Sequence, residues 1–392
     1  MSKKPQNTAF KQQRLKSWQP LLIPKTVIPV LFFLGVVFIP VGVALFIAAN
    51  NVNEVVLDYT NCINATDSLA APSFKNTGIN KWKYDPTTNI CLIEFNVPAQ
   101  ITAPVYIYYR LSNFYQNNRK YVSSFDLHQL SGATPTKLSP SCEPVATVKA
   151  EANVKVALNG VSRSPAEGAV YYPCGLVANS QFSDVISDLK CIQSDYKFNG
   201  AFCNSTTVNY MFSATGIAWP ADAQKYGDSK YKDLPEEELN TKVIPPPFWQ
   251  KSFPKWKDGY NKTNFPDLAT DERFQVWMRT AGLPTFRKLW GVQKNSLLPS
   301  GTWQLEITQQ FDTNKFGGTK SIVISSASLL GGKNTFLGSA YVLVGCLCVG
   351  LGVAFLIRNL VKPRKLGDHL LLSWNQTPAN AEQNAALLGQ NH

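Results

Sequence analysis

The sequence predicts a membrane protein in which two transmembrane α-helices flank one large β-rich domain. One uncharged apolar segment lies near each end of the 392-residue chain, at residues 27–49 and 336–357. Each is longer than the ~20 residues that cross a hydrocarbon core as a helix. Residues 50–335 are polar and contain cysteines and alternating runs. Two crossings place both tails on one side of the membrane and residues 50–335 on the other.

Basic residues flank both apolar segments on their outer sides. Residues 1–26 contain six Lys and Arg and no acid. Residues 358–392 begin with a basic cluster, and their end, rich in Gln, Asn and Ala, is predicted to be disordered. The positive-inside rule predicts that both tails are cytosolic and that residues 50–335 form a lumenal or extracellular ectodomain. The net charge of +12 therefore reflects topology and anionic inner-leaflet lipid, not nucleic-acid binding.

The ectodomain contains six cysteines, and an even number in an oxidising compartment predicts up to three disulfides. They are Cys62, Cys91, Cys142, Cys174, Cys191 and Cys203. Pairing each cysteine with its neighbour along the chain is the simplest of many connectivities, and the spacing alone does not choose among them. A metal site is disfavoured, because there is no C-x-x-C motif and the ectodomain has a single histidine, His128.

Three sequons predict N-linked glycans on the ectodomain, at Asn64, Asn204 and Asn261. A fourth sequon, at Asn375, lies in the predicted cytosolic tail and should stay unmodified.

Alternating and β-branched runs predict a mainly antiparallel, sandwich-like sheet structure. The runs are residues 90–97, 105–111, 154–158, 303–311 and 321–325. One short helix is predicted where Thr270 can cap, Asp271 and Glu272 suit the positive helix end, and Gly282 and Pro284 follow.

Between residues 200 and 266 the chain is rich in Pro, Lys and aromatic residues, which predicts long irregular loops. Their aromatic side chains are expected to be buried: Trp219, Phe248, Trp249, Phe253 and Trp256. Residues 50–335 contain no evident linker, so we predict one domain.

No catalytic constellation emerges from the ectodomain. Its only histidine, His128, lies in an ordinary FDLHQL segment, and there is no G-x-S-x-G elbow or H-E-x-x-H motif. Paired carboxylates are present, but nothing in the sequence places them at a site, and we interpret the pair Asp184 and Asp188 as a solvated face. The chain is therefore predicted to have no catalytic and no metal-binding residues, which disfavours an ectoenzyme.

Small residues recur every four positions in both apolar segments. They are Cys346, Gly350 and Ala354 in the second, and Ala44 and Ala48 in the first. Such faces permit close helix packing, either within the chain or with a partner. Neither segment contains an ionisable acid or base, so neither resembles an ion path.

Seven motifs, in this order, resemble one known family. They are NTAFKQQRLKSWQP at 7–20, FYQNNRKYV at 114–122, PCGLVANS at 173–180, IPPPFW at 244–249, FQVWMRTAGLP at 274–284, FGGTKS at 316–321 and GGKNTFLG at 331–338. The chain resembles the accessory (beta) subunits of type IV P-type ATPase lipid flippases, the cell-division-cycle-fifty family. The resemblance covers about residues 7–374.

The resemblance implies a non-catalytic glycoprotein that forms a 1:1 heterodimer with a flippase alpha subunit. It implies a role in export from the endoplasmic reticulum to the Golgi, endosome or plasma membrane, and in the pump's phosphorylation cycle. The alpha subunit moves aminophospholipids to the cytosolic leaflet, so ATP and Mg²⁺ belong to the partner. No cofactor is expected on this chain beyond N-linked glycans.

The resemblance also implies that Cys142 pairs with Cys174 and that Cys62 pairs with Cys91. The third bridge, Cys191–Cys203, is our own inference. One departure is visible: where many members have a sequon after the ANS string, this chain has Ser183-Asp184-Val185. Glycan positions therefore cannot be taken from the family.

Three groups of residues are candidate contacts with the partner. The small-residue face of Cys346, Gly350 and Ala354 would pack on a membrane helix of the alpha subunit. Arg14, Leu15 and Trp18 in the N-tail would touch the cytosolic side of the pump. Tyr115, Arg119 and Tyr121 would touch its lumenal loops, although packing within the ectodomain explains them equally well.

The main rival is a subunit of a two-span ligand-gated channel, a class with similar length, cytosolic tails and a disulfide-rich ectodomain. Such channels assemble as trimers and line their pore with polar residues. The second apolar segment offers only Ser339 and Tyr341 near its start, so the accessory subunit is favoured.

Overall fold

The computed structural model describes residues 6–15, 23–73, 77–149, 156–158, 161–166, 168–198, 201–203, 209–326 and 333–363. Residues 156–158, 161–163, 195–198 and 201–203 are described by their backbone alone. The chain divides into two compact units. One contains the two apolar helices (Met1–Asn50 with Asn334–His392), and the other is the β-rich domain, Asn51–Lys333.

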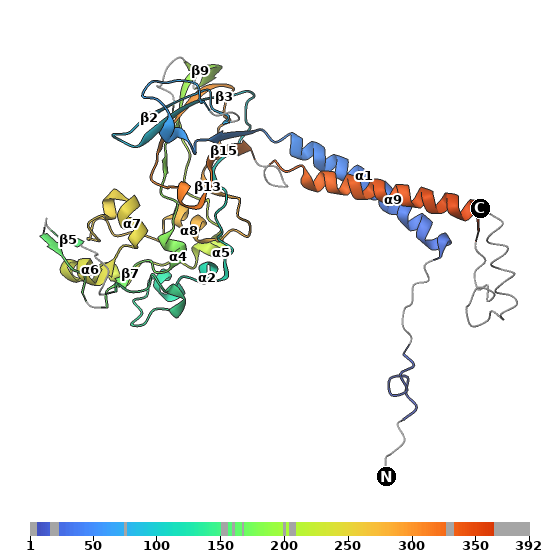
Figure 1. Ribbon diagram of the computed structural model, residues 1–392, viewed down its shortest axis with the longest axis horizontal. Coiled ribbons are helices and arrows are strands. Elements are labelled where there is room, and N and C mark those ends of the chain that lie inside the picture. The colour runs from blue at the N-terminus through green and yellow to red at the C-terminus, as the bar shows by residue number, and fades with distance from the viewer. Residues whose placement is uncertain are drawn as a thin grey trace, which may run out of the picture. The chain divides into compact units, whose positions relative to one another are not determined.

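The first unit is an antiparallel pair of long helices (Figure 1). Helix α1 spans Pro24–Asn50 and helix α9 spans Phe336–Val361. Both are long and apolar enough to cross a membrane. Helix α9 continues four residues beyond the predicted segment and so includes Arg358. Two prolines lie inside α1, as is tolerated in membrane helices.

The β-rich domain contains two main antiparallel sheets. The four-stranded sheet has the order β1-β15-β4-β13, and the seven-stranded sheet has β10-β9-β14-β3-β2, with β11 beside β9 and β8 beside β14. The first comprises β1 (Glu54–Asp58), β15 (Lys320–Ser326), β4 (Val105–Leu111) and β13 (Phe286–Gln293). The second comprises β10 (Ala201–Cys203), β9 (Leu189–Phe198), β14 (Gly301–Thr308), β3 (Ile90–Val97), β2 (Lys81–Asp85), β11 (Asn209–Tyr210) and β8 (Val185–Ile186).

Short elements complete the β-rich domain. Two small sheets pair β12 (Val243–Ile244) with β7 (Val170–Tyr171) in parallel and β5 (Val156–Leu158) with β6 (Val161–Arg163) antiparallel. The helices are α2 (Arg119–Val122), α3 (Leu127–Leu130), α4 (Leu176–Asn179), α5 (Pro220–Ala223), α6 (Glu236–Lys242), α7 (Pro247–Ser252) and α8 (Glu272–Met278).

One hydrophobic core joins both main sheets. Strand β3 alternates, burying Cys91, Ile93 and Phe95 while the residues between them stay half-exposed. Strand β4 of the other sheet buries Ile107 and Tyr109 in the same core. This alternation removes one face of each sheet from water. The predicted β-rich antiparallel fold with few short helices is confirmed.

The predicted runs at 90–97 and 105–111 coincide with β3 and β4, and the runs at 303–311 and 321–325 fall on β14 and β15 within three residues. Of the run at 154–158, the described part forms β5. The predicted cap at Thr270 is wrong. Asp271 is the N-cap of α8 and accepts a hydrogen bond from the Phe274 N–H, while the Thr270 hydroxyl donates to Asp267.

The interpretation of Asp184 as part of a solvated face is also wrong. Asp184 is 1% exposed, and its carboxylate links segments next to strands of both main sheets. Oδ2 accepts hydrogen bonds from the Tyr59 hydroxyl (2.9 Å) and the Lys320 ammonium (2.8 Å). Oδ1 accepts from the backbone N–H groups of Gln310 and Phe311, both at 2.6 Å. Asp188, half-buried, accepts from the Phe212 N–H (3.0 Å).

Candidate partner-binding surfaces

Glycines spaced seven residues apart bring helices α1 and α9 into contact. Gly35 and Gly42 on α1 are buried, as are Gly338, Gly345 and Gly352 on α9. A Cβ at Gly42 would lie 2.9 Å from the Gly338 carbonyl oxygen, so only glycine allows this approach. We predicted contact faces from a spacing of four. The helices pair through a spacing of seven, which is also visible in the sequence and is typical of left-handed helix pairs.

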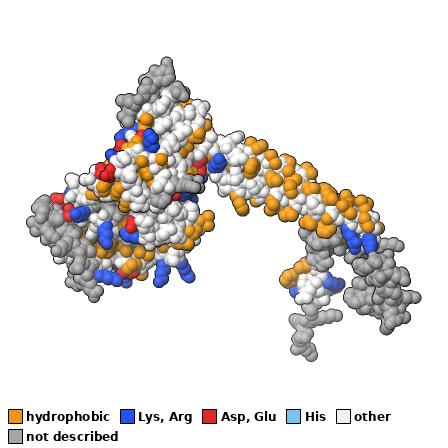
Figure 2. All heavy atoms as spheres, turned by 45° about the horizontal axis from the view of Figure 1, so that its top comes forward, with side chains coloured by type: hydrophobic (Ala, Val, Ile, Leu, Met, Phe, Trp, Pro, Cys, Tyr) orange, Lys and Arg blue, Asp and Glu red, His pale blue; other side chains and the backbone are white. Residues whose placement is uncertain are grey.

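The small-residue face of the second span is not used in this pairing. Cys346, Gly350 and Ala354 are exposed, and a Cβ at Gly350 would meet no described atom within 4 Å. Most side chains around both helices are apolar and exposed (Figure 2). Such a surface needs lipid or another helix around it, and the face at Gly350 is the place where another backbone could approach most closely.

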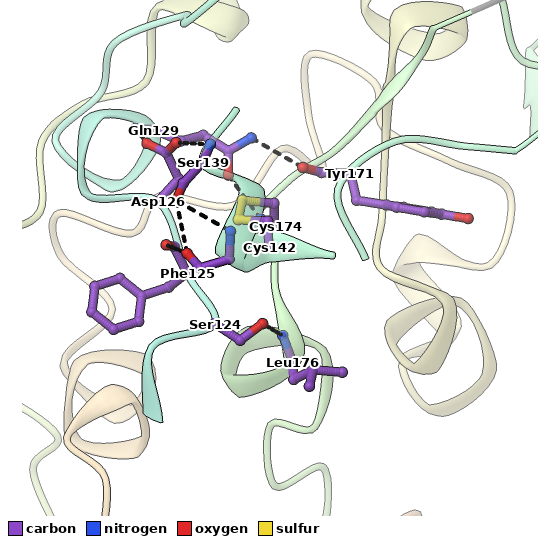
Figure 3. Close-up of a disulfide and its surroundings, with 10 residues drawn as sticks. Ser124, Phe125, Asp126, Gln129, Ser139, Cys142, Tyr171, Cys174 and Leu176 are labelled. Carbon is purple, nitrogen blue, oxygen red and sulfur yellow. Dashed lines mark hydrogen bonds between the residues drawn. A yellow bond between two sulfur atoms is a disulfide. The ribbon is translucent and has the colours of Figure 1, made fainter. Parts of the chain in front are cut away.

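The P-C-G motif lies in a core that a disulfide and several hydrogen bonds hold together (Figure 3). Cys174 is disulfide-bonded to Cys142. The buried side chain of Gln129 donates a hydrogen bond to the Tyr171 carbonyl (3.0 Å) and accepts one from the Cys174 N–H (2.7 Å). Asp126, also buried, accepts from the backbone N–H groups of Gln129 and Ser139. These contacts make the motif structural.

Of the three predicted contact residues Tyr115, Arg119 and Tyr121, two are exposed and one is packed into the domain. Tyr121 packs inward: its hydroxyl lies 2.8 Å from Ser180 Oγ, its ring meets Phe114 edge-on, and burial raises its pKa to about 12. Tyr115 is 58% exposed, and Arg119 is exposed at the start of α2. Tyr115 and Arg119 can therefore reach a partner, whereas Tyr121 serves the fold.

Sequence reasoning missed an exposed aromatic residue beside these two. Trp249 and Trp256 are buried as expected and Phe248 and Phe253 are half-buried, but Trp219 is 65% exposed. Its ring lies 4.8 Å from the Arg279 guanidinium, which also forms an ion pair with Asp222 (3.4 Å). The compositional argument failed because α5 begins with Pro220 at the surface, directly after Trp219.

Two adjoining cavities surround this tryptophan and arginine. One, of about 390 Å³, is lined by Trp219, Arg279 and Lys288; the other, of about 340 Å³, shares Arg279 and is otherwise largely apolar. The loop containing Tyr115 lies beside them, because the Asn117 amide donates to the Gly282 carbonyl (3.1 Å). We call Tyr115, Arg119, Trp219 and Arg279 the Trp219 surface. Exposed aromatic and arginine side chains around hollows are typical of protein interfaces.

Lys288 supports this surface from beneath. Its side chain is buried, and its ammonium donates to the carbonyl oxygens of Val276, Trp277 and Arg279 at the end of α8. Burial lowers its pKa to about 7. At the other end of α8, the Glu272 carboxylate accepts from three successive backbone N–H groups, of residues 216–218, before Trp219. Both ends of α8 thus fix the segments that present Trp219 and Arg279.

Comparison with known proteins places the chain in a family. Residues 45–365 match the model of the LEM3 (ligand-effect modulator 3) family / CDC50 family. The chain belongs to the LEM3/CDC50 family. It is 34% identical to the phospholipid-transporting ATPase accessory subunit CRF1 of Saccharomyces cerevisiae (98% of this chain, 93% of the relative). It is 36% identical to cell cycle control protein 50A of Mus musculus (91% and 90%), and 34% identical to ALA-interacting subunit 3 of Arabidopsis thaliana (96% and 92%).

Membership of the LEM3/CDC50 family, together with helices α1 and α9, makes this chain an integral membrane protein. The disulfides Cys62–Cys91 and Cys142–Cys174 are the two pairs that the family resemblance implied. Cys191 is disulfide-bonded, and the side chain of its predicted partner Cys203 lies outside the described part.

The remaining predicted sites are placed only in part. Asn64 is exposed, directly after the Cys62 bridge. Asn261 is half-buried, and its side-chain oxygen accepts hydrogen bonds from N and Oγ1 of Thr263, in its own sequon. Arg14 is exposed. Trp18 and Asn204 lie outside the described residues. His128 is exposed on α3.

Proposed function

We propose that this chain is the non-catalytic accessory subunit of a type IV P-type ATPase that moves aminophospholipids to the cytosolic leaflet. The observation that carries the proposal is the match along nearly the whole chain to proteins named as accessory subunits of phospholipid-transporting ATPases. The chain would bind one alpha subunit in a 1:1 complex. It would support folding and exit of the pump from the endoplasmic reticulum to the Golgi, endosome or plasma membrane.

Each surface has a role in this proposal. The Gly350 face of α9 would pack on a membrane helix of the alpha subunit, because it lies open while the α1 contact uses other glycines. The Trp219 surface would cover the short lumenal loops of the pump, because its aromatic and arginine side chains are exposed. Arg14 and Trp18 in the N-tail would contact the pump on the cytosolic side. ATP and Mg²⁺ would bind only to the alpha subunit.

Affinity purification tests the partner directly. The full chain, tagged at its C-terminus, is purified from native membranes in mild detergent, and co-purifying proteins are identified by mass spectrometry. We expect a P-type ATPase in stoichiometric amount. A homotrimer without an ATPase would overturn the proposal and favour the two-span channel.

A pair of glycine variants tests the helix face. Gly350→Leu should reduce recovery of the ATPase while leaving α1 and α9 paired. Gly345→Leu is the matched control for damage to the pair itself, since its Cβ would lie 2.7 Å from Ile39 Cγ1. Unchanged recovery with Gly350→Leu would contradict the assignment of this face.

Deletion of residues 1–20 tests the N-tail. The truncated chain should still assemble with the ATPase but change its ATP hydrolysis rate. An unchanged rate would leave the tail as a topology signal only.

A further inference from the structure

An open groove lies between α1 and α9 at the end of the helix pair that leads to both chain termini. Its volume is about 580 Å³. Pro24, Val27 and Ile28 of α1 form one wall, and Phe355 of α9 forms the apolar part of the other. Arg358, Asn359 and Lys362 line the polar end of the groove. A spacing of three to four residues places Phe355, Arg358 and Asn359 on one face of α9, and Lys362 is the C-cap of this helix.

The groove joins an apolar surface and a cationic surface. Its walls continue the exposed apolar surface of the two helices. Its polar end contains two cations, Arg358 and Lys362, both exposed. Within residues 6–15, 23–50 and 333–363, the described parts nearest to them in sequence, there is no Asp or Glu. No carboxylate of these segments therefore neutralises the two cations.

The helix dipoles do not decide the sign of this site. At this end α1 begins and α9 ends, so their partial charges oppose one another. The side chains of Arg358 and Lys362 therefore set a positive potential. An arginine fork and an ammonium four residues apart suit the oxygens of a phosphate group, and the Asn359 amide can add a further donor.

We propose that this groove binds an anionic phospholipid, with its phosphate on Arg358 and Lys362 and one acyl chain between Ile28 and Phe355. The boundary between apolar wall and cationic end matches the boundary between hydrocarbon and headgroup in a bilayer. Basic pockets between transmembrane helices on the cytosolic side are a known way of binding acidic headgroups. This site goes beyond the proposed accessory function and depends only on α1 and α9 lying in a membrane.

Photolabelling of the full chain in nanodiscs tests the site. Two probes have the same diazirine acyl chain but different headgroups, phosphatidic acid and phosphatidylcholine. We expect the phosphatidic acid probe to label peptides containing Ile28 and Phe355 in clear excess over the choline probe. Unlabelled phosphatidic acid should compete, and unlabelled phosphatidylcholine should not.

Charge variants measure the two cations. Arg358→Gln or Lys362→Gln should raise the mole fraction of phosphatidic acid needed for half-maximal labelling about 5-fold each, and the double variant about 30-fold. The control variant Lys4→Gln/Lys11→Gln removes as much charge as the double groove variant, but from the N-tail on the same side of the membrane. It should raise the mole fraction of phosphatidic acid needed for half-maximal labelling less than about 2-fold.

Three results would overturn the proposal. The first is equal labelling of the groove by both probes. The second is a shift in the N-tail control as large as that in the double groove variant. That result would mean that the overall surface potential attracts the lipid and that the groove is not a specific site. The third comes from a benzophenone amino acid in place of Phe355 in the complex purified from native membranes: crosslinks to a protein partner without lipid adducts would mean that a partner helix fills the groove.

Discussion

Replacing Asp184 by Asn tests whether one buried carboxylate holds the two main sheets together. The substitution keeps the size of the side chain and an oxygen for the backbone N–H groups of Gln310 and Phe311. It removes the charge that faces the Lys320 ammonium, whose side chain is 5% exposed and 2.8 Å away. The ammonium then stays buried without its counter-ion.

The loss of folding stability comes from that unpaired ammonium. Breaking a buried ion pair by removing one partner costs about 3–5 kcal/mol. For a domain of this size each kcal/mol lowers the unfolding midpoint by about 2–4 °C. We therefore expect Asp184→Asn to lower the midpoint of the β-rich domain by about 6–20 °C. Asp188→Asn is the matched control. Asp188 is half-buried and accepts a hydrogen bond from the Phe212 N–H, so about 1 kcal/mol is expected.

The assay is thermal unfolding of the detergent-solubilised full chain, followed by intrinsic tryptophan fluorescence at one fixed scan rate. A second substitution, Lys320→Met, removes the stranded ammonium. The double variant Asp184→Asn/Lys320→Met should be more stable than Asp184→Asn alone, since replacing a buried pair by less polar groups is often nearly neutral. A midpoint shift below about 2 °C for Asp184→Asn, or strictly additive shifts in the double variant, would refute this reasoning.

Three further outcomes follow from single sites. The Lys288 pKa of about 7 lies below its value of about 10.4 in the unfolded chain, so between these values the unfolded chain binds a proton that the folded chain lacks. Stability should therefore rise from pH 7 to pH 9. In the Lys288→Met variant the unfolding midpoint should rise less steeply with pH than in the unchanged chain, and equal slopes in the two proteins would contradict this prediction. Gly175→Ala should destabilise more than Gly168→Ala. Both glycines have φ above +70°, but only a Cβ at Gly175 would meet a carbonyl oxygen, that of Ser124 at 2.0 Å. Equal unfolding midpoints of the two variants would show that the backbone shifts to relieve this contact. Asn64→Gln should lower the apparent mass of the protein on a gel by the mass of one glycan, and Asn375→Gln should leave it unchanged. The reverse pattern would contradict the predicted topology.

Local patterns predicted the elements whose residues carry their own signal. The two long helices follow from uncharged apolar length, and β3 and β4 follow from alternation, because burial of one sheet face imposes a period of two. Strand β13 was not predicted. Its segment FRKLWGVQ contains Arg287 and Lys288, which read as solvent-exposed. In the fold Lys288 is buried against the end of α8, 9 to 12 residues earlier in the chain, where its ammonium donates to backbone carbonyl oxygens. This tertiary contact buries a charged residue, so composition alone does not reveal the strand.

The candidate partner-binding surfaces could also be predicted from the sequence only in part. The spacing of Cys346, Gly350 and Ala354 defines one face of a helix, but only the packing of α1 on α9 leaves that face open. The pattern placed Trp219 inside and Asp184 outside, and the structure has the reverse.

Local periodicity and residue order are enough to predict two apolar helices, a β-rich domain between them and the family motifs. Which polar groups are buried, which aromatic residue is exposed and which glycines join the helices became clear from the three-dimensional fold. Each of those depends on contacts between segments far apart in the chain, such as Asp184 with Lys320, and the energy of such a contact is not encoded in either segment alone.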